Sequence, residues 1–314
     1  MLRDILRGDL QARAVARVLA HVRPDIVVLQ GIDYDAAGRG LQALRETVAE
    51  EGLLLPHQFA LRPNTGMATD LDLNGDGRRG GPRDAQGYGR FSGHRGMAIL
   101  SRWPIDQSEV EDFSRRLWRD MPGAQLPRWP DGRPFPSSEA QALQRLSSVG
   151  HWVVPIHIPN GGKLRFLVFH AAPPVFDGKE DRNGLRNAAE IRFWLHYLDG
   201  VFGAPVQERF VIAGVANIDP TRGTGRREAI QSLLKDPRLQ DPRPLSGFAQ
   251  ANTVNWPEPE PGDMRASYIL PSHDWKILGS GVFWPAPDAP TAELLSYKDI
   301  DASHHRIVWV DLEM

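Results

Sequence analysis

The chain has 314 residues, enough for one large α/β domain or two average ones, and a formal net charge of −2 at pH 7. That balance excludes a strong basic field of the kind that drives non-specific nucleic-acid binding, so nothing in it points to a nucleic-acid partner. The chain contains no cysteine, which excludes disulfides, thiolate metal ligands and cysteine nucleophiles.

The first part of the chain alternates predicted helices and strands. Asp9 can cap a helix that runs to about Val22, and residues 25–30 read as a buried strand of parallel type. A second helix is expected over residues 40–51, followed by a short strand over residues 59–62.

The middle of the chain is dominated by loops. A long loop rich in Gly, Arg and Asp covers residues 63–95, and the buried strand 97–101 follows it. Residues 105–147 read as mostly irregular, with short helical pieces at 112–118 and 138–146.

The last half of the chain returns to regular elements. Strands 151–158 and 163–170 are joined by Asn160-Gly161-Gly162, which is a strong hairpin signal. The remaining expected elements are helices at 180–198 and 226–234 and strands at 210–213, 265–270, 275–284 and 306–312. No internal repeat and no linker interrupts the pattern, so residues 1–314 are predicted to form a single α/β domain. No run approaches the roughly 18 apolar residues of a membrane span and no signal peptide is visible, so we expect a soluble protein of unassigned location.

The strand at residues 210–213 ends at the point where we expect a functional site. Gly214 closes the apolar run, and polar Asn217 and Asp219 follow. α/β proteins usually keep their sites at such strand ends. Val215 is unexpected there, because a catalytic strand end would be expected to offer a carboxylate.

Five segments, read together in order, carry a family resemblance. They are PDIVVLQ (24–30), GMAILSRWPI (96–105), LRFLVFHA (164–171), VIAGVANIDP (211–220) and RASYILPS with ASHHRIVWVDL (265–272 and 302–312). In this order the chain resembles the endonuclease/exonuclease/phosphatase superfamily over nearly its whole length. The resemblance implies a four-layer α/β sandwich, in which two packed, mixed, largely antiparallel sheets are flanked by helices. It also implies metal-assisted hydrolysis of phosphoesters, with a divalent cation on carboxylates and a histidine that handles protons.

Part of the family's catalytic set has a counterpart in this sequence. The resemblance assigns catalytic positions to His170, Asn217 and His305. The family's first strand, which contributes an Asn to the site, would lie before Leu2 and is absent from this chain.

The four expected carboxylates are replaced. Gly31 stands where the metal-binding Glu is expected, and Val215, Ser267 and His304 stand where Asp is expected. Mg²⁺ prefers hard oxygen ligands that include carboxylates, so these replacements argue against Mg²⁺ or Mn²⁺ in the cleft and against the standard mechanism. A rearranged site that uses Asp33 and Asp35, just past Gly31, as cleft ligands is the alternative; these acids, with the nearby histidines, could also hold a softer transition metal.

A separate signal in the long loop suggests calcium. Asp72, Asn74 and Asp76, followed by Gly77, reproduce the first half of an EF-hand-type loop. Arg83 stands at the twelfth position, where Glu is expected. The alternative interpretation is a cluster of Asx and Gly turns on a surface loop.

Arginine-rich loops suggest an anionic ligand. Arg182 and Asn183 follow the His170 strand, where the family's loops border the phosphate pocket, so they are candidate phosphate-binding residues. Three hypotheses stay open: a catalytically degenerate protein that binds a phosphate-containing ligand or a metal, an active phosphoesterase with a rearranged site, and a non-catalytic structural or interaction protein. The sequence specifies neither the substrate nor the oligomeric state.

Overall fold

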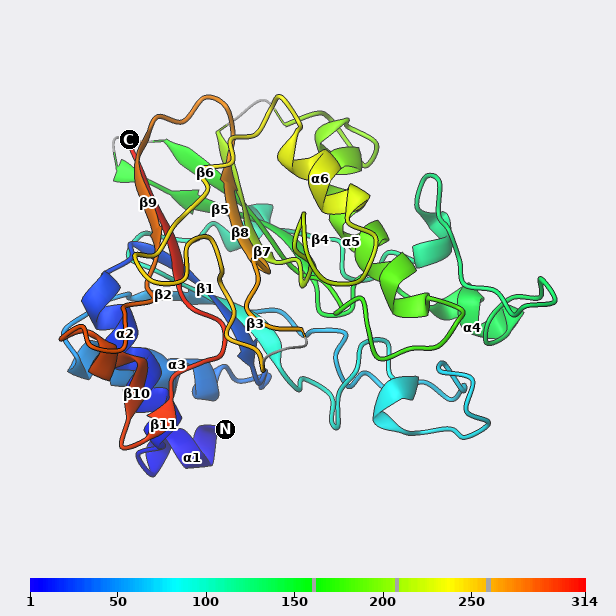
Figure 1. Cartoon of the computed structure of the whole chain (residues 1–314), viewed down its shortest axis with the longest axis horizontal. Helices are drawn as coiled ribbons and strands as arrows, with labels where there is room; N and C mark the ends of the chain where they lie inside the picture. The colour runs from blue at the N-terminus through cyan, green and yellow to red at the C-terminus, as the bar shows by residue number, and fades with distance from the viewer. Residues whose placement is uncertain (160–161, 207–208, 258–260) are drawn as a thin grey trace.

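The computed structural model describes residues 1–159, 162–206, 209–257 and 261–314. Figure 1 shows a layered arrangement of helices outside strands. Helices α2 (Leu10–Val22) and α3 (Arg39–Glu50) lie outside one set of strands, and helices α5 (Arg182–Leu198) and α6 (Glu228–Leu234) lie outside the other. The expected α/β sandwich of packed sheets flanked by helices is therefore confirmed.

One layer is a continuous five-stranded sheet with the strand order β4-β5-β6-β7-β8. Strands β6 and β7 are parallel, and the other neighbours are antiparallel. The strands are β4 (Glu111–Asp112), β5 (His151–His157), β6 (Lys163–His170), β7 (Phe210–Val215) and β8 (Ser267–Pro271). The β5–β6 hairpin was predicted, but residues 160 and 161 of its turn lie outside the described part of the chain.

The facing layer is divided into two smaller sheets. One is three-stranded, with β1 (Ile26–Ile32) beside β3 (Gly96–Ser101) and β3 beside β2 (His57–Phe59). The other pairs β9 (Ile277–Val282) with β12 (Val308–Leu312). The expectation that residues 25–30 form a strand of parallel type is wrong, because β1 pairs antiparallel with β3. A strand buried on both faces reads as a continuous apolar run whatever its direction, so the run alone does not set the direction.

The helices cover the outer faces of the two layers. Asp9 caps α2 as predicted, because its carboxylate accepts a hydrogen bond of 2.8 Å from the backbone N–H of Ala12. The helices are α1 (Leu2–Leu6), α2 (Leu10–Val22), α3 (Arg39–Glu50), α4 (Ser138–Leu143), α5 (Arg182–Leu198) and α6 (Glu228–Leu234). In the described part of the chain, no helix is long and apolar enough to cross a membrane.

Three apolar clusters hold the layers together. The cluster between the two sheets contains Trp152, Phe166 and Val211. A second cluster packs α5 and α6 against the five-stranded sheet, and a third packs α2 and α3 against β1 and β3. Each apolar side chain that is fully removed from water stabilises the fold by about 1.5–3 kcal/mol, so these clusters are the main source of stability.

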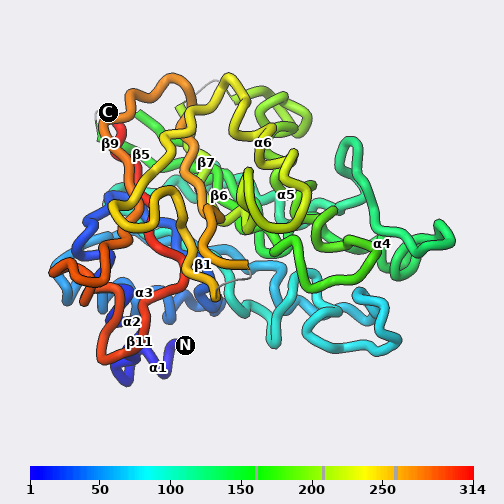
Figure 2. The backbone as a smooth tube through the Cα atoms, in the orientation of Figure 1, coloured from blue at the N-terminus to red at the C-terminus, as the bar shows by residue number. Residues whose placement is uncertain are grey.

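The irregular segments differ from the prediction in detail. The expected helix over residues 112–118 is wrong: β4 ends at Asp112, and a short 3₁₀ helix, η3 (Trp118–Asp120), follows. The predicted loop over residues 63–95 contains the short η1 (Pro82–Asp84). Figure 2 shows this loop and the segment around α4 at the end of the molecule away from α1. The small β10–β11 hairpin (Ser296–Tyr297 and Ile300–Asp301) was not predicted.

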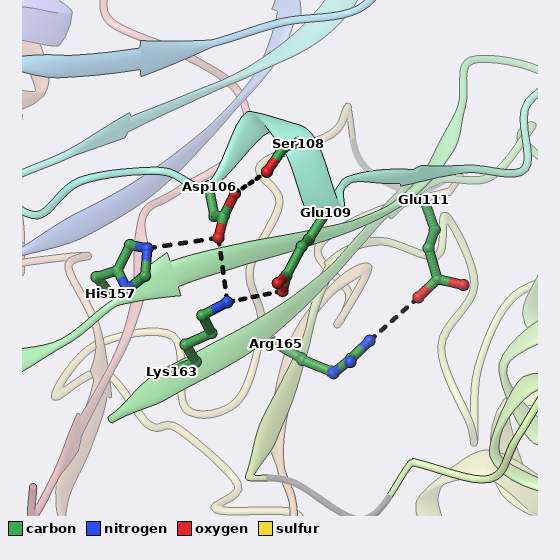
Figure 3. Close-up of polar contacts among 7 residues, drawn as sticks. All are labelled: Asp106, Ser108, Glu109, Glu111, His157, Lys163 and Arg165. Carbon is green, nitrogen blue, oxygen red and sulfur yellow. Dashed lines mark hydrogen bonds and ion pairs between the residues drawn. The ribbon is translucent and has the colours of Figure 1, made fainter. Parts of the chain in front are cut away.

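An ion network fixes the edge of the five-stranded sheet (Figure 3). The Lys163 ammonium lies 3.1 Å from the Asp106 carboxylate and 2.8 Å from that of Glu109. Ser108 donates a 2.6 Å hydrogen bond to Asp106, and His157 lies 3.5 Å from the same carboxylate. The segment before β4 is thereby attached to the β5–β6 hairpin.

Candidate functional site

Three strand ends bring the candidate site together. Across the five-stranded sheet, His170 is paired with Val215, and Val215 is paired with Ser267. Gly214, just before this row, allows β6 and β7 to approach: a Cβ there would lie 2.1 Å from the carbonyl oxygen of Phe169. The strand at whose end the sequence predicted a site is β7. It ends at the buried Val215, which lies between His170 and Ser267.

His170 is held by a residue of the other sheet layer. Its Nδ1 lies 2.9 Å from Oε1 of Gln30, at the end of β1. The amide Nε2 of Gln30 donates to the carbonyl of Phe169, so Oε1 is the atom that faces the imidazole. His170 therefore donates from Nδ1 and keeps the lone pair on Nε2. Burial, followed by the nearby His305, lowers the pKa of His170 to about 3, so the ring is neutral at pH 7.

His305 lies at the opposite side of the row. Its Nδ1 is 3.3 Å from the hydroxyl oxygen of Ser267, and the Trp256 ring packs edge-on against it with centroids 5.8 Å apart. Burial, followed by the charge of His304, lowers the pKa of His305 to about 4. The site thus contains two neutral imidazoles, each oriented through Nδ1 by an uncharged side chain.

Asn217 shapes the chain that leaves β7. It adopts a left-handed conformation with φ 54°, which Asn tolerates better than most residues. Its side-chain amide donates a 2.8 Å hydrogen bond to the carbonyl of Ala171. Asn187 of α5 donates to the carbonyls of Ala172 and Ala216, so two amides tie the ends of β6 and β7 together.

The residues at the strand ends do not fit Mg²⁺ or Mn²⁺. These ions need hard oxygen donors that include carboxylates. The matched positions hold Gly31, a Val215 that is 3% exposed, Ser267 and His304. Throughout the described ranges, no three Asp, Glu, His or Cys side chains converge in a way that could hold a metal ion.

The acids near these positions are engaged elsewhere. Asp33 accepts a 3.0 Å hydrogen bond from the backbone N–H of Arg95. Asp35 accepts from the backbone N–H groups of Arg39 and Gly40 at the start of α3. Burial raises the pKa of Asp35, but the backbone hydrogen bonds together lower it by more. The pKa of Asp35 therefore lies below its ordinary value. Neither residue lines the cavity that Gln30 and His305 line.

Gly31 has a backbone that only glycine adopts readily. Its φ is +78°, and the pairing of β1 with β3 shifts register between Gln30 and Ile32. The expected Glu would therefore occupy a left-handed position in a bulge, which costs an L-residue free energy.

Arg182 and Asn183 do not join the histidines. The Arg182 guanidinium donates to the side-chain oxygen of Gln144 at 2.7 Å, and burial lowers its pKa to about 10. The Asn183 side chain donates to the carbonyl of Val175 and so folds the loop after β6. Both residues organise loops near the site rather than the strand-end row.

The candidate calcium loop is closed by its own hydrogen bonds. Asp72 accepts from the backbone N–H groups of Asn74, Gly75 and Gly77, and the Asn74 amide donates to Asp76 at 3.0 Å. The side-chain oxygen Oδ1 of Asn74 is buried without a hydrogen-bond partner. The three predicted ligands thus lie together, although far along the chain from the histidines.

The sequence did not predict one buried acid close to the site, Glu190. Glu190 of α5 is 0% exposed and accepts hydrogen bonds from the N–H and hydroxyl of Ser148 and from the N–H of Ala172. The Ser148 hydroxyl oxygen also lies 3.1 Å from the carbonyl oxygen of His170, so its single hydrogen is shared between this carbonyl and Glu190. Glu190 therefore fixes the segment that carries His170. The sequence indicated this role only through the position of an acid on the apolar face of a predicted helix.

Comparisons with known proteins give a family and a fold. The model of the Endonuclease/Exonuclease/phosphatase family matches residues 2–303. Among curated proteins, none matches the sequence.

Solved structures share the arrangement at low identity. An endonuclease/exonuclease/phosphatase from Beutenbergia cavernae is 18% identical with a TM-score of 0.59, over 96% of this chain and 66% of that protein. A mannosyl-6-phosphatase from Bacteroides thetaiotaomicron is 16% identical, with a TM-score of 0.53 over 99% and 95% of the two chains. Beta toxin from Staphylococcus aureus is 15% identical, with a TM-score of 0.55 over 99% and 95%.

Proposed function

Because the chain belongs to the endonuclease/exonuclease/phosphatase family, we propose that its strand-end site binds a phosphate-containing ligand without the family's metal-assisted hydrolysis. The observation that supports this proposal is the set of polar groups at the strand ends. Two oriented, neutral imidazoles, His170 and His305, remain at the site, while the four positions that would hold carboxylates do not supply one.

The site can contribute hydrogen bonds rather than charge. Phosphate oxygens accept hydrogen bonds from hydroxyl, amide and imidazole N–H groups. Ser267 supplies a hydroxyl beside His305. Each ring uses its Nδ1–H within the protein and presents an unprotonated Nε2, so a ring donates to a phosphate oxygen only after Nε2 is protonated. Since neither imidazole is charged at pH 7, binding of a small phosphate is expected to be weak at that pH.

The test combines a binding and an activity measurement on the same protein. Inorganic phosphate should perturb the ring resonances of His170 and His305 in NMR spectra, and His305→Ala should remove the effect. Hydrolysis of bis(4-nitrophenyl) phosphate in Mg²⁺, Mn²⁺ or Ca²⁺ should stay at the buffer rate. Hydrolysis that His305→Ala abolishes would refute the non-catalytic assignment and establish the second candidate function, an active phosphoesterase.

One contact favours that second candidate. The Ser267 hydroxyl can accept from Nδ1–H of His305, which leaves Nε2 as a neutral base. In this arrangement Ser267 would orient the ring, as a carboxylate does elsewhere. The low pKa of His305 makes it a weak base, so we place binding ahead of hydrolysis.

We also propose that the loop around Asp72 binds Ca²⁺. The support is the proximity of Asp72, Asn74 and Asp76 and the buried acceptor Oδ1 of Asn74, which a cation would satisfy. Asp84 is less suited as a further ligand, because its carboxylate already accepts from the N–H groups of Leu73 and Gly81.

A further inference from the structure

Phe176, in the loop between β6 and α5, has a backbone conformation that aromatic residues rarely adopt. Its φ is +71°, in the left-handed region. A positive φ in a bulky residue costs free energy, and such outliers cluster at ligand-binding sites. Among the non-glycine residues with positive φ in the described ranges, Phe176 is the only apolar one, and the others carry polar or charged side chains.

Burial of the Phe176 ring does not offset this cost. The residue is 74% exposed, so removal of the ring from water contributes little to folding. A single exposed apolar side chain is common and indicates nothing by itself. Here, however, the exposed ring stands on a left-handed backbone, so the fold gains neither packing nor a favourable φ from the residue. A contact with a ligand is therefore the role that remains for the ring.

One residue of α5 holds the chain on both sides of Phe176. The Asn183 side chain donates a 2.7 Å hydrogen bond to the carbonyl of Val175, and the Asn183 backbone N–H donates to the carboxylate of Asp177. The ring is thus presented from a backbone that is already ordered. Such preorganisation lowers the entropic cost of binding a ligand.

The segment after β7 holds the same loop from the other side. Arg226 forms an ion pair of 2.8 Å with Asp181, near the end of the loop. Gly225 packs so closely that a Cβ there would lie 2.8 Å from the side chain of Pro174. The loop that carries Phe176 therefore lies between α5 and the segment that leaves the candidate site.

Helix α5 places the loop at the rim of the strand-end site. Its Asn187 donates to the carbonyls of Ala172 and Ala216, just past the ends of β6 and β7. Asn183 and Asn187 are four residues apart on the helix, so they lie on one face about 6 Å from each other. Phe176 is therefore anchored about one helical turn beyond the ends of β6 and β7.

Charge decides which end of a ligand faces this loop. Three acids and one lysine follow Phe176 in the loop: Asp177, Lys179, Glu180 and Asp181. An anionic group is therefore favoured at the histidines rather than at the loop, and the part of the ligand that reaches Phe176 is uncharged. Because neutral imidazoles hold a small phosphate only weakly, the rest of the ligand has to supply affinity.

We propose that Phe176 determines specificity at the strand-end site, because its ring stacks on a flat aromatic group of the ligand, and that the site therefore prefers aryl phosphates. The inference rests on the proposed phosphate binding beside His170 and His305. The phosphate lies at the imidazoles, and the aromatic group extends towards the loop after β6. A stacked pair of aromatic rings strengthens binding by about fivefold.

The experiment compares phenyl phosphate with methyl phosphate on the full chain. At pH 4, below the second phosphate pKa of about 6, each ester carries about one negative charge, and His305 is partly protonated. NMR titration of the His305 ring resonances measures both dissociation constants at the site itself. We expect phenyl phosphate to bind about fivefold more tightly. Equal affinities would overturn the inference.

Variants of Phe176 separate the ring from the loop. Phe176→Asn removes the ring, and Asn tolerates a left-handed backbone, so this variant should not lower Tm. It should bind both esters with the affinity that the unmodified protein has for methyl phosphate. Phe176→Tyr keeps an aromatic ring and should retain the preference. The matched control is Leu54→Ala, which removes a 72% exposed side chain ahead of β2 and should also retain the preference.

The remaining outcomes distinguish the two proposals. If Phe176→Asn also weakens the binding of methyl phosphate, the loop rather than the ring is responsible, and the inference is wrong. If both esters perturb His305 equally in the unmodified protein, the phosphate site stands and only the aromatic preference fails. If neither ester perturbs His305, the proposed phosphate site fails and the inference fails with it.

Discussion

The Nδ1 atom of His170 lies 2.9 Å from Oε1 of Gln30, a contact that joins the two sheet layers across 140 residues of sequence. It fixes the tautomer of the ring and attaches the end of β6 to the end of β1. A neutral amide occupies this position, so nothing in the contact favours a charged imidazole. Burial, followed by the nearby His305, keeps the ring neutral, and the amide of Gln30 fixes its orientation.

Replacement of that amide should change the protonation of the ring. In Gln30→Glu, a carboxylate faces Nδ1 and favours the imidazolium, so the pKa of His170 should rise from about 3 towards its ordinary value. NMR titration of the ring resonances measures this shift. Gln30→Met, which keeps the bulk without the acceptor, should leave the pKa low, and an unchanged pKa in Gln30→Glu would contradict the orientation described for His170.

Anion binding should strengthen in acid. The pKa values of His170 and His305, about 3 and about 4, are both lowered, so the rings become charged only as pH falls towards these values. We expect the affinity for sulfate, whose charge is constant in this range, to rise about tenfold from pH 6 to pH 4. Calorimetric titration of the folded protein measures it. His305→Ala should flatten the dependence, and a flat profile in the unmodified protein would show that the imidazoles do not contact the anion.

Removal of the buried Glu190 side chain should lower the free energy of unfolding. Glu190→Ala leaves the N–H and hydroxyl of Ser148 and the N–H of Ala172 without their acceptor, so the free energy of unfolding should fall by about 3 to 5 kcal/mol. Urea unfolding gives this value. The control Glu50→Ala removes an exposed helical acid and should change stability by less than about 0.5 kcal/mol. A similar small change in Glu190→Ala would disprove the supporting role.

The ion network in Figure 3 leads us to expect that the unmodified protein and Asp106→Asn differ in how their stability falls in acid. The hydrogen bond from Ser108, followed by that from Lys163, lowers the pKa of Asp106 to about 2 from an ordinary 3.8. A lowered carboxylate pKa gives stability that is present above pH 3.8 and is lost as pH falls through 2. Between pH 4 and pH 2 the unmodified protein should therefore lose more Tm than Asp106→Asn. Asp288→Asn, at an exposed loop position, is the matched control, and parallel Tm curves for all three proteins would contradict the coupling.

Calcium should stabilise the protein through the Asp72 loop. At 100 times the dissociation constant, bound Ca²⁺ adds about 2.7 kcal/mol to the free energy of unfolding. Asp76→Ala should remove the rise of Tm with Ca²⁺, while Asp274→Ala, at an exposed position in another loop, should retain it. Asp76 is preferable to Asp72 for this test because the Asp72 carboxylate also closes the turn. A Tm that Ca²⁺ leaves unchanged would refute calcium binding.

The sequence predicted the fold and the row of strand ends, but not what surrounds the row. His170 and Ser267 fall beside Val215 because apolar runs and their order determine which strands pair. The contact of Gln30 with His170 joins residues that no local pattern relates. The sequence also did not predict that Arg182 donates to Gln144. A long side chain at the start of a helix can reach several acceptors, and the loop conformations decide which one is near. The direction of β1 was predicted wrongly because burial on both faces is compatible with either pairing.

The backbone at Gly31 also limits which side chains this strand end tolerates. A Glu at this position would place a side chain at φ +78°, within the register shift between Gln30 and Ile32. A Gly31→Glu replacement is therefore expected to cost folding free energy through its backbone conformation, even though a Cβ at this position meets no neighbouring atom within 4 Å.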